Sequence, residues 1–100
     1  MLKYYIKGGD YSMKTFVLFE KKLVDYLYMC KRYKMKPMLN IINYGNKETL
    51  LAFDEVRIIP YDAGIIYFMY EHKKILEIKL SDIINCEYKD GGLFFNVYLK

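Results

Sequence analysis

The sequence of 100 residues contains few of the side chains from which catalytic and metal centres are built. It has one histidine, His72, and two cysteines, Cys30 and Cys86. These three residues are too few and too widely separated for structural zinc, whose four ligands come in closely spaced pairs. Gly8-Gly9 and Gly91-Gly92 lack the spacing of a phosphate-binding loop. No metal site and no cofactor site is predicted.

The same scarcity argues against catalysis. His72 lies in a polar segment typical of a solvated turn, and a general base needs a partner that orients it. Cys30 and Cys86 are each surrounded by apolar residues, where a buried thiol has a raised pKa and reacts poorly. We expect both to be reduced core residues of a cytoplasmic protein rather than a disulfide. The chain is predicted not to be an enzyme.

Long hydrophobic runs are missing as well. The longest, Ile65–Tyr70, has six residues, whereas a membrane-spanning helix needs about 20. Residues 1–7 show neither the apolar region nor the cleavage site of a signal peptide. Without internal repeats, low-complexity tracts or linkers, the sequence predicts one domain over residues 1–100, located in the cytoplasm and without a membrane span.

Arginine is scarce: the chain has two arginines and fourteen lysines. Its formal net charge is +4. Because the planar fork of arginine is favoured for reading bases, this scarcity argues against a dedicated DNA reader. Lysine, isoleucine, asparagine and tyrosine have AT-rich codons, and their abundance favours a low-GC bacterium, or a phage or mobile element living in one, as the source.

Aromatic residues, by contrast, are plentiful. Twelve tyrosines and six phenylalanines stand in a chain that is 54% hydrophobic, which excludes disorder. The tyrosines exceed what a core of this size needs, and tyrosine is enriched at protein interfaces. Strand propensity alone also places tyrosine on exposed sheet faces. Both explanations remain open at this point.

One helix is predicted, at about residues 18–35. At about 100° per residue one face collects apolar side chains, namely Phe19, Leu23, Tyr26, Leu27, Cys30 and Tyr33. Basic residues gather towards its end, where the helix dipole favours positive charge. Pro37 then prevents its continuation. Residues 12–19 fit either a strand or the start of this helix.

The rest of the chain predicts strands with polar turns between them. Strands are expected at residues 2–7, 38–44, 48–59 (with a bend near 54–55), 65–70, 75–80, 83–88 and 93–99. Turns are expected at residues 8–10, 45–46, 60–64, 71–73, 81–82 and 90–92. Such short connections favour antiparallel neighbours. The predicted fold class is α+β: a mostly antiparallel meander of six to eight short strands, curled or closed into a small barrel, with the one helix.

Residues 74–88 resemble a recurring piece of PH-like and GRAM-like β-barrel modules. The alternating Leu76, Ile78 and Leu80 run through Ser81-Asp82-Ile83 into the next strand, and residues 90–95 continue the likeness. The resemblance covers residues 49–99 and implies a bacterial scaffold that commonly binds proteins or phosphoinositides. It departs from the family in its helix, which precedes the sheet instead of coming after it. No ligand-binding residue is carried over.

Segment 28–36 is the candidate binding site. It interleaves aromatic and basic side chains, and the residues expected to bind a partner are Tyr28, Lys31, Arg32, Tyr33, Lys34 and Lys36. Such a patch suits an acidic protein surface, anionic lipid, or the phosphates and bases of a nucleic acid. A solvated helix end that complements its own dipole gives the same pattern.

These observations rank the functions. The first hypothesis is a non-catalytic protein-binding module, in the form of an inhibitor or adaptor encoded by a phage or mobile element and acting on a host protein complex, for example against host defence. The second is single-stranded nucleic-acid binding through residues 28–36, with an affinity that falls steeply with salt. A homodimer is also considered, because an uncovered hydrophobic sheet face would favour one.

Overall fold

Residues 13–33 form one continuous helix, α1 (Met13–Tyr33), in the computed structural model of the chain. The structure describes residues 2–4, 13–43, 45–59 and 64–100. The ambiguous residues 13–19 therefore belong to the helix, which begins earlier than predicted. Most of the first predicted strand, the turn at residues 8–10 and most of the turn at residues 60–64 lie outside the described residues.

Backbone hydrogen bonds at its last turn, rather than Pro37, end helix α1. Lys34 has a positive φ of 55°, and its N–H donates to the Lys31 carbonyl at 3.3 Å. The N–H of Met35 donates to the Cys30 carbonyl at 2.8 Å. This pair of bonds is the Schellman motif, in which a left-handed residue lets the chain turn back on the last helical carbonyls. The helix thus stops at Tyr33, ahead of the proline.

The buried face of α1 is largely the predicted one. Four of its six residues are buried: Phe19, Leu23, Tyr26 and Cys30. Leu27 is partly buried and packs against the core, but Tyr33 is exposed, which the prediction had wrong. Tyr33 is the last helical residue, where the chain turns away, and Met29 is buried instead.

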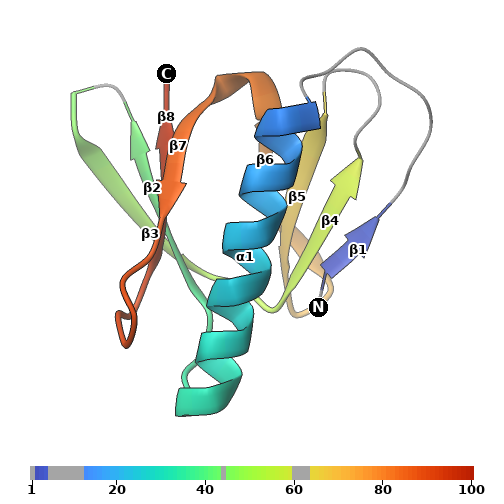
Figure 1. Ribbon diagram of the computed structural model, residues 1–100. Helices are drawn as coiled ribbons and strands as arrows, with labels where there is room; N and C mark the ends of the chain where they lie inside the picture. The colour runs from blue at the N-terminus through green and yellow to red at the C-terminus, as the bar shows by residue number, and fades with distance from the viewer. Residues whose placement is uncertain (1, 5–12, 44, 60–63) are drawn as a thin grey trace.

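Eight strands among the described residues form two four-stranded sheets (Figure 1). The first has the order β1-β4-β5-β6, with the bounds β1 (Leu2–Tyr4), β4 (Glu55–Ile59), β5 (Ile65–Tyr70) and β6 (Lys73–Lys79). The second has the order β3-β2-β8-β7, with the bounds β3 (Lys47–Ala52), β2 (Met38–Asn43), β8 (Phe95–Leu99) and β7 (Ile83–Glu87). The bend predicted near residues 54–55 is the point at which the chain leaves the second sheet for the first.

The predicted α+β class with mostly antiparallel strands is confirmed, and the described residues do not close into a barrel. Two neighbouring pairs are nevertheless parallel, β1 with β4 and β2 with β8. The β2–β8 pair follows from the path of the chain after β6. At the predicted corner, the short 3-10 helix η1 (Leu80–Asp82) turns the chain out of the first sheet. Strand β7 therefore pairs with β8 rather than with β6, and β8 lies beside β2.

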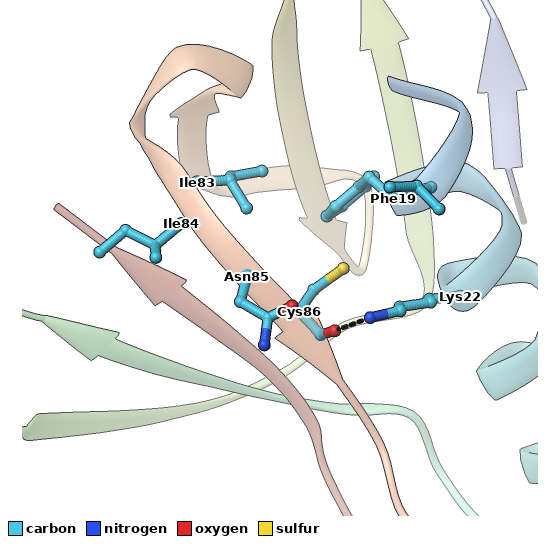
Figure 2. A pocket seen from close by; sticks show the side chains of 7 residues that line it. Phe19, Lys22, Ile83, Ile84, Asn85 and Cys86 are labelled. Carbon is cyan, nitrogen blue, oxygen red and sulfur yellow. Dashed lines mark hydrogen bonds between the residues drawn. The ribbon is translucent and has the colours of Figure 1, made fainter. Parts of the chain in front are cut away.

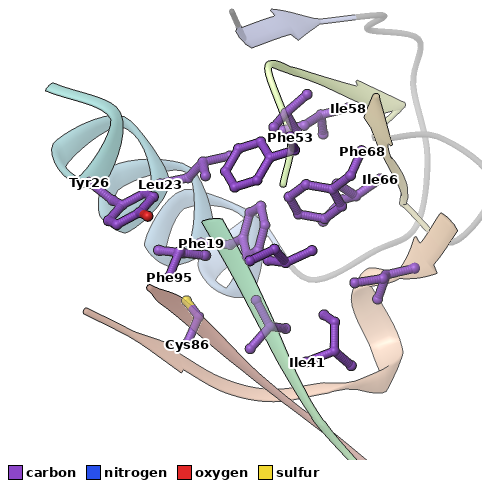
Figure 3. Close-up of a cluster of buried hydrophobic side chains, with 14 of the residues drawn as sticks. Phe19, Leu23, Tyr26, Ile41, Phe53, Ile58, Ile66, Phe68, Cys86 and Phe95 are labelled. Carbon is purple, nitrogen blue, oxygen red and sulfur yellow. The ribbon is translucent and has the colours of Figure 1, made fainter. Parts of the chain in front are cut away.

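Helix α1 and both sheets share one hydrophobic core (Figure 3). Phe19 of the helix meets Phe95 of β8 edge to face, with ring centroids 5.9 Å apart. Phe53, just before β4, and Phe68 of β5 make a similar contact at 5.2 Å. Such edge-to-face pairs add to the burial of apolar area that drives folding. The helix thereby joins two sheets that share no strand.

Both cysteines are core residues, as predicted. Cys30 on α1 and Cys86 on β7 are buried, and neither forms a disulfide. Burial raises the pKa of the Cys30 thiol and of the Cys86 thiol, because it disfavours the charged thiolate. These are the properties of inert structural thiols.

Candidate functional site along helix α1

The outward side of α1 carries apolar side chains that the core leaves uncovered. Val17, Val24 and Tyr28 are 52%, 42% and 71% exposed. At about 100° per residue these positions fall within a narrow sector of the helix. Lys31 extends the same sector and is exposed. An exposed apolar row on a helix is a feature that partners commonly cover.

Arg32 connects the end of α1 to the β7–β8 hairpin. Its Nη2 atom lies 3.1 Å from Oδ1 of Asp90 and 3.2 Å from the hydroxyl oxygen of Tyr33. The guanidinium also stands over the Tyr33 ring, 4.7 Å from its centroid. More than half of the Arg32 side chain is still exposed. An exposed pair of this kind contributes about 0–1 kcal/mol, so Arg32 can still meet a partner.

Segment 28–36 contains three further basic residues. Lys31, Lys34 and Lys36 are exposed, and none of the three forms an ion pair within the part of the chain that the structure describes. We group these lysines with the apolar row and the Arg32–Tyr33 contact under one name, the α1 surface. It consists of Val17, Val24, Tyr28, Lys31, Arg32, Tyr33, Lys34 and Lys36.

A depression of about 190 Å³ lies beside the α1 surface. It is lined by Asp25, Tyr28, Met29, Arg32, Tyr88 and Asp90. The pKa of Tyr88 is raised, first by burial and then by the nearby negative charges of Asp25 and Asp90. Its hydroxyl therefore stays neutral and can exchange hydrogen bonds with a partner. Of the six predicted residues, only Tyr28 and Arg32 line this depression.

A second depression, of about 140 Å³, lies where α1 meets β7. Lys22 crosses it, and its Nζ atom donates to the Cys86 carbonyl at 2.7 Å (Figure 2). Leu18 of the helix and Ile84 of β7 both line it and are at least half exposed. Exposed apolar side chains of the helix and of β7 therefore both border this depression.

Sequence reasoning missed the contribution of the β7–β8 region. Asp90 was assigned only to a turn and Tyr88 only to a strand, yet both line the depression beside Arg32. Arg32 and Asp90 are 58 positions apart, and no local pattern predicts a contact over that separation. Val17 and Val24 did carry a signal, since their spacing of seven residues is that of one helical face.

The candidate catalytic residues lie on separate elements. His72 is exposed in the turn between β5 and β6, with a φ of 67°, whereas both thiols are buried in the core. Within the described ranges no group of three or more histidine, cysteine, aspartate or glutamate residues is arranged to hold a metal ion. None of the helices described there is both long and apolar enough to cross a membrane.

Comparisons of the chain with models of protein families, with curated proteins and with solved structures gave no significant match. The resemblance of residues 49–99 to PH-like modules therefore stays a prediction, and function must be argued from the surface itself.

Proposed function

We propose that this chain is a non-catalytic protein-binding module and that the α1 surface binds an acidic patch on its partner. The observation that carries the proposal is the row of Val17, Val24 and Tyr28, exposed beside three lysines that lack acidic partners among the described residues. Apolar area supplies affinity, and the positive end gives charge complementarity and faster association. Tyr28 is suited to be the central anchor, because tyrosine buries a large ring with few rotatable bonds.

Nucleic-acid binding is the second candidate, and the stack of Arg32 on Tyr33 favours it, since single strands use aromatic and arginine platforms. One feature makes it the weaker proposal. Val17 and Val24 add apolar area that a phosphate backbone does not need.

The biological setting belongs to the same proposal. A small cytoplasmic inhibitor or adaptor, encoded by a phage or mobile element and acting on a host complex, is supported by the abundance of residues with AT-rich codons. Its target would then be a bacterial protein with an acidic surface. Binding alone would suffice for inhibition if that surface is the target's own functional site.

The test uses charge reversal with a matched control. The variant Lys31→Glu/Arg32→Glu/Lys34→Glu removes the basic end of α1. The control Lys47→Glu/Lys73→Glu/Lys79→Glu makes the same change in net charge at exposed lysines on β3 and β6. Each protein is immobilised and exposed to lysate of a low-GC bacterium, and its binding to a single-stranded oligothymidylate is measured by fluorescence anisotropy at two salt concentrations.

We expect wild type and control to retain one stoichiometric protein that the α1 variant does not retain. Equal retention by all three proteins would contradict the role of the α1 surface. Salt-sensitive binding of the oligonucleotide, lost in the α1 variant alone, would instead establish the nucleic-acid alternative. Light scattering of the purified chain tests the homodimer in the same preparation.

A further inference from the structure

Strand β7 is an edge of the second sheet, and helix α1 lies beside it (Figures 1 and 2). The depression of about 140 Å³ between these two elements has buried residues at its base, because Phe19 and Cys86 are only 1% and 5% exposed. Leu18 of the helix and Ile83 and Ile84 of the strand supply apolar walls. One water molecule needs about 10–15 Å³ of such space, so the depression can admit a group of several heavy atoms.

Lys22 places a positive charge in these apolar surroundings. Its side chain is partly buried, and its Nζ atom donates to the Cys86 carbonyl at 2.7 Å (Figure 2). An ammonium group has three N–H donors, and this is the one hydrogen bond that Lys22 makes among the described residues. Two N–H groups of Lys22 therefore remain for a ligand.

No carboxylate neutralises Lys22 within the part of the chain that the structure describes, since none of the ion pairs there includes it. Glu87 follows Cys86 in β7, but side chains alternate along a strand, so Glu87 points to the opposite face of the sheet. Its Oε1 atom accepts from the Tyr98 hydroxyl at 2.8 Å. The charge of Lys22 is thus available to an anion from outside.

A cation between apolar walls selects an anion that carries an apolar group. A carboxylate accepts from two N–H groups at once, and the hydrogen bonds are strengthened by the charge on both partners. Apolar walls lower the local dielectric and strengthen them further. In the last residue of a peptide the carboxylate and the side chain diverge from one carbon atom, so both can enter the depression together.

The rim of the depression favours a peptide over a small free acid. Leu18 and Ile84 are 50% and 64% exposed, so apolar area remains uncovered outside the depression itself. The residue that precedes the last one in a peptide can cover this area, whereas a small acid cannot. Capture of a C-terminal carboxylate is also a recurring mode of peptide recognition.

We propose that this depression, called here the Lys22 pocket and defined by Leu18, Lys22, Ile83 and Ile84, binds the C-terminal residue of a peptide that ends in leucine or another branched aliphatic residue. The terminal carboxylate accepts from Lys22 Nζ, and the aliphatic side chain packs on Leu18 and Ile83. At about 100° per residue, Leu18 and Lys22 point to a different side of α1 from the exposed row of the α1 surface. The site does not depend on the function proposed for that surface.

The probe is acetyl-glycyl-alanyl-leucine with a free carboxylate, titrated into ¹⁵N-labelled protein while the backbone amide signals of Ile84 and Cys86 are followed by NMR. The matched ligand is the C-terminal amide of the same peptide, which lacks the charge. The test variant is Lys22→Gln, and the control variant Lys21→Gln makes the same change at the preceding lysine, which is exposed. Well-dispersed spectra show that each variant is folded.

We expect saturable shifts in wild type and in Lys21→Gln, with a dissociation constant in the millimolar range typical of so small a ligand. In Lys22→Gln the affinity for the free acid should fall about tenfold, as expected for the loss of a charge-assisted hydrogen bond. The amide peptide should bind wild type about as weakly and should not distinguish it from Lys22→Gln. A further variant, Ile84→Thr, makes one wall less apolar and should weaken both peptides.

The variant Lys31→Glu/Arg32→Glu/Lys34→Glu should keep its affinity for the free acid, which separates the Lys22 pocket from the α1 surface. Equal affinity for the acid and the amide would show that no carboxylate is recognised, and unchanged affinity in Lys22→Gln would place the ligand elsewhere. A strictly linear response would mean that there is no site. If 4-methylpentanoate, which keeps the carboxylate and the branched chain, binds as tightly as the peptide, the assignment to a peptide is wrong and a small acid replaces it.

Discussion

Nη2 of Arg32 lies 3.1 Å from Oδ1 of Asp90, so the end of helix α1 is tied to the β7–β8 hairpin by an exposed ion pair. Exposed pairs add little stability, and this one also cancels part of the positive charge of the α1 surface. The carboxylate therefore weakens the attraction of Arg32 for an acidic partner.

We predict that Asp90→Asn raises the affinity for an acidic partner a few-fold at low salt. Titration calorimetry with the captured partner measures it, and the gain should shrink as salt screens the charges over about 10 Å at 0.1 M. The free energy of unfolding should change by less than about 1 kcal/mol. A loss of affinity would mean instead that Asp90 orients Arg32 for binding.

Tyr26 is the polar centre of the core. Its hydroxyl accepts from the Met38 N–H at 2.9 Å and lies 2.8 Å from the Leu93 carbonyl, to which it donates. Removing it in Tyr26→Phe leaves two backbone groups unpaired, so we predict a loss of about 2 kcal/mol in the free energy of unfolding. Urea denaturation measures this. The control Tyr28→Phe alters an exposed hydroxyl and should stay near wild type.

Lys34 is a lysine where the backbone favours glycine. Its φ of 55° costs a residue with a side chain more than it costs glycine. We predict that Lys34→Gly raises the free energy of unfolding by about 0.5–1 kcal/mol. The variant Lys36→Gly is the control, because φ at this residue is not positive, and it should bring no gain. A destabilised Lys34→Gly protein would show that the lysine side chain itself supports the helix end.

Oδ1 of Asn40 has no hydrogen-bond partner among the described residues, and stability data can show whether folding requires this side chain. Asn40→Leu replaces a half-satisfied amide with an apolar side chain of similar volume, so urea unfolding should give a stability equal to wild type or about 1 kcal/mol higher. A loss above about 2 kcal/mol would show that the hydrogen bonds from Asn40 Nδ2 to Glu48 and Asn96 hold the sheet together.

Stability should fall at alkaline pH. Burial raises the pKa of the thiols of Cys30 and Cys86, so the folded state keeps protons that the unfolded state releases above its ordinary thiol pKa of about 8.5. The unfolded state then binds fewer protons, and stability declines by at most about 1.4 kcal/mol per pH unit for each thiol. Burial also raises the pKa of Tyr26, which adds a loss in the same direction above about pH 10.

Urea unfolding at pH 7.5, 9 and 10 measures this decline. Cys30→Ala/Cys86→Ala lacks both thiols, so its stability should fall less steeply between pH 7.5 and 9, whatever its stability at neutral pH. Equal slopes for the two proteins would show that the thiols do not contribute to the decline.

Local patterns predicted the elements well, because each depends on neighbours in the chain. The spacing of Phe19, Leu23 and Tyr26 defines one helical face, and the apolar run Ile65–Tyr70 is strand β5. The burial of Met29 and the exposure of Tyr33 were not predictable. Tyr33 is exposed where the Schellman turn ends α1, and Met29 lies against the β7–β8 hairpin, whose Gly91 N–H donates to its sulfur. The parallel pairing of Leu39 with Phe95 was missed for a similar reason, as it depends on the chain changing sheets at η1.

The same distinction between local patterns and long-range contacts applies to the candidate sites. Segment 28–36 was identified because its aromatic and basic residues are adjacent in the sequence. The burial of Asn40 left no such signal. In the sequence, Asn40 is one polar residue in a strand, and its burial and unused oxygen exist only once β3 and β8 lie on either side of it.

Because β2 pairs with β8, the second sheet cannot be completed until β8 has been synthesised. Asn40 and Asn96, neighbours on this pair, are 56 positions apart in the chain. At about 5–20 residues per second, β2 leaves the ribosome several seconds before β8 arrives. Meanwhile Leu39 and Ile41 lack the strand that later covers one edge of β2. We expect newly made chains to attract chaperones in that interval, and slow translation of the codons between β2 and β8 to lower the yield of native protein.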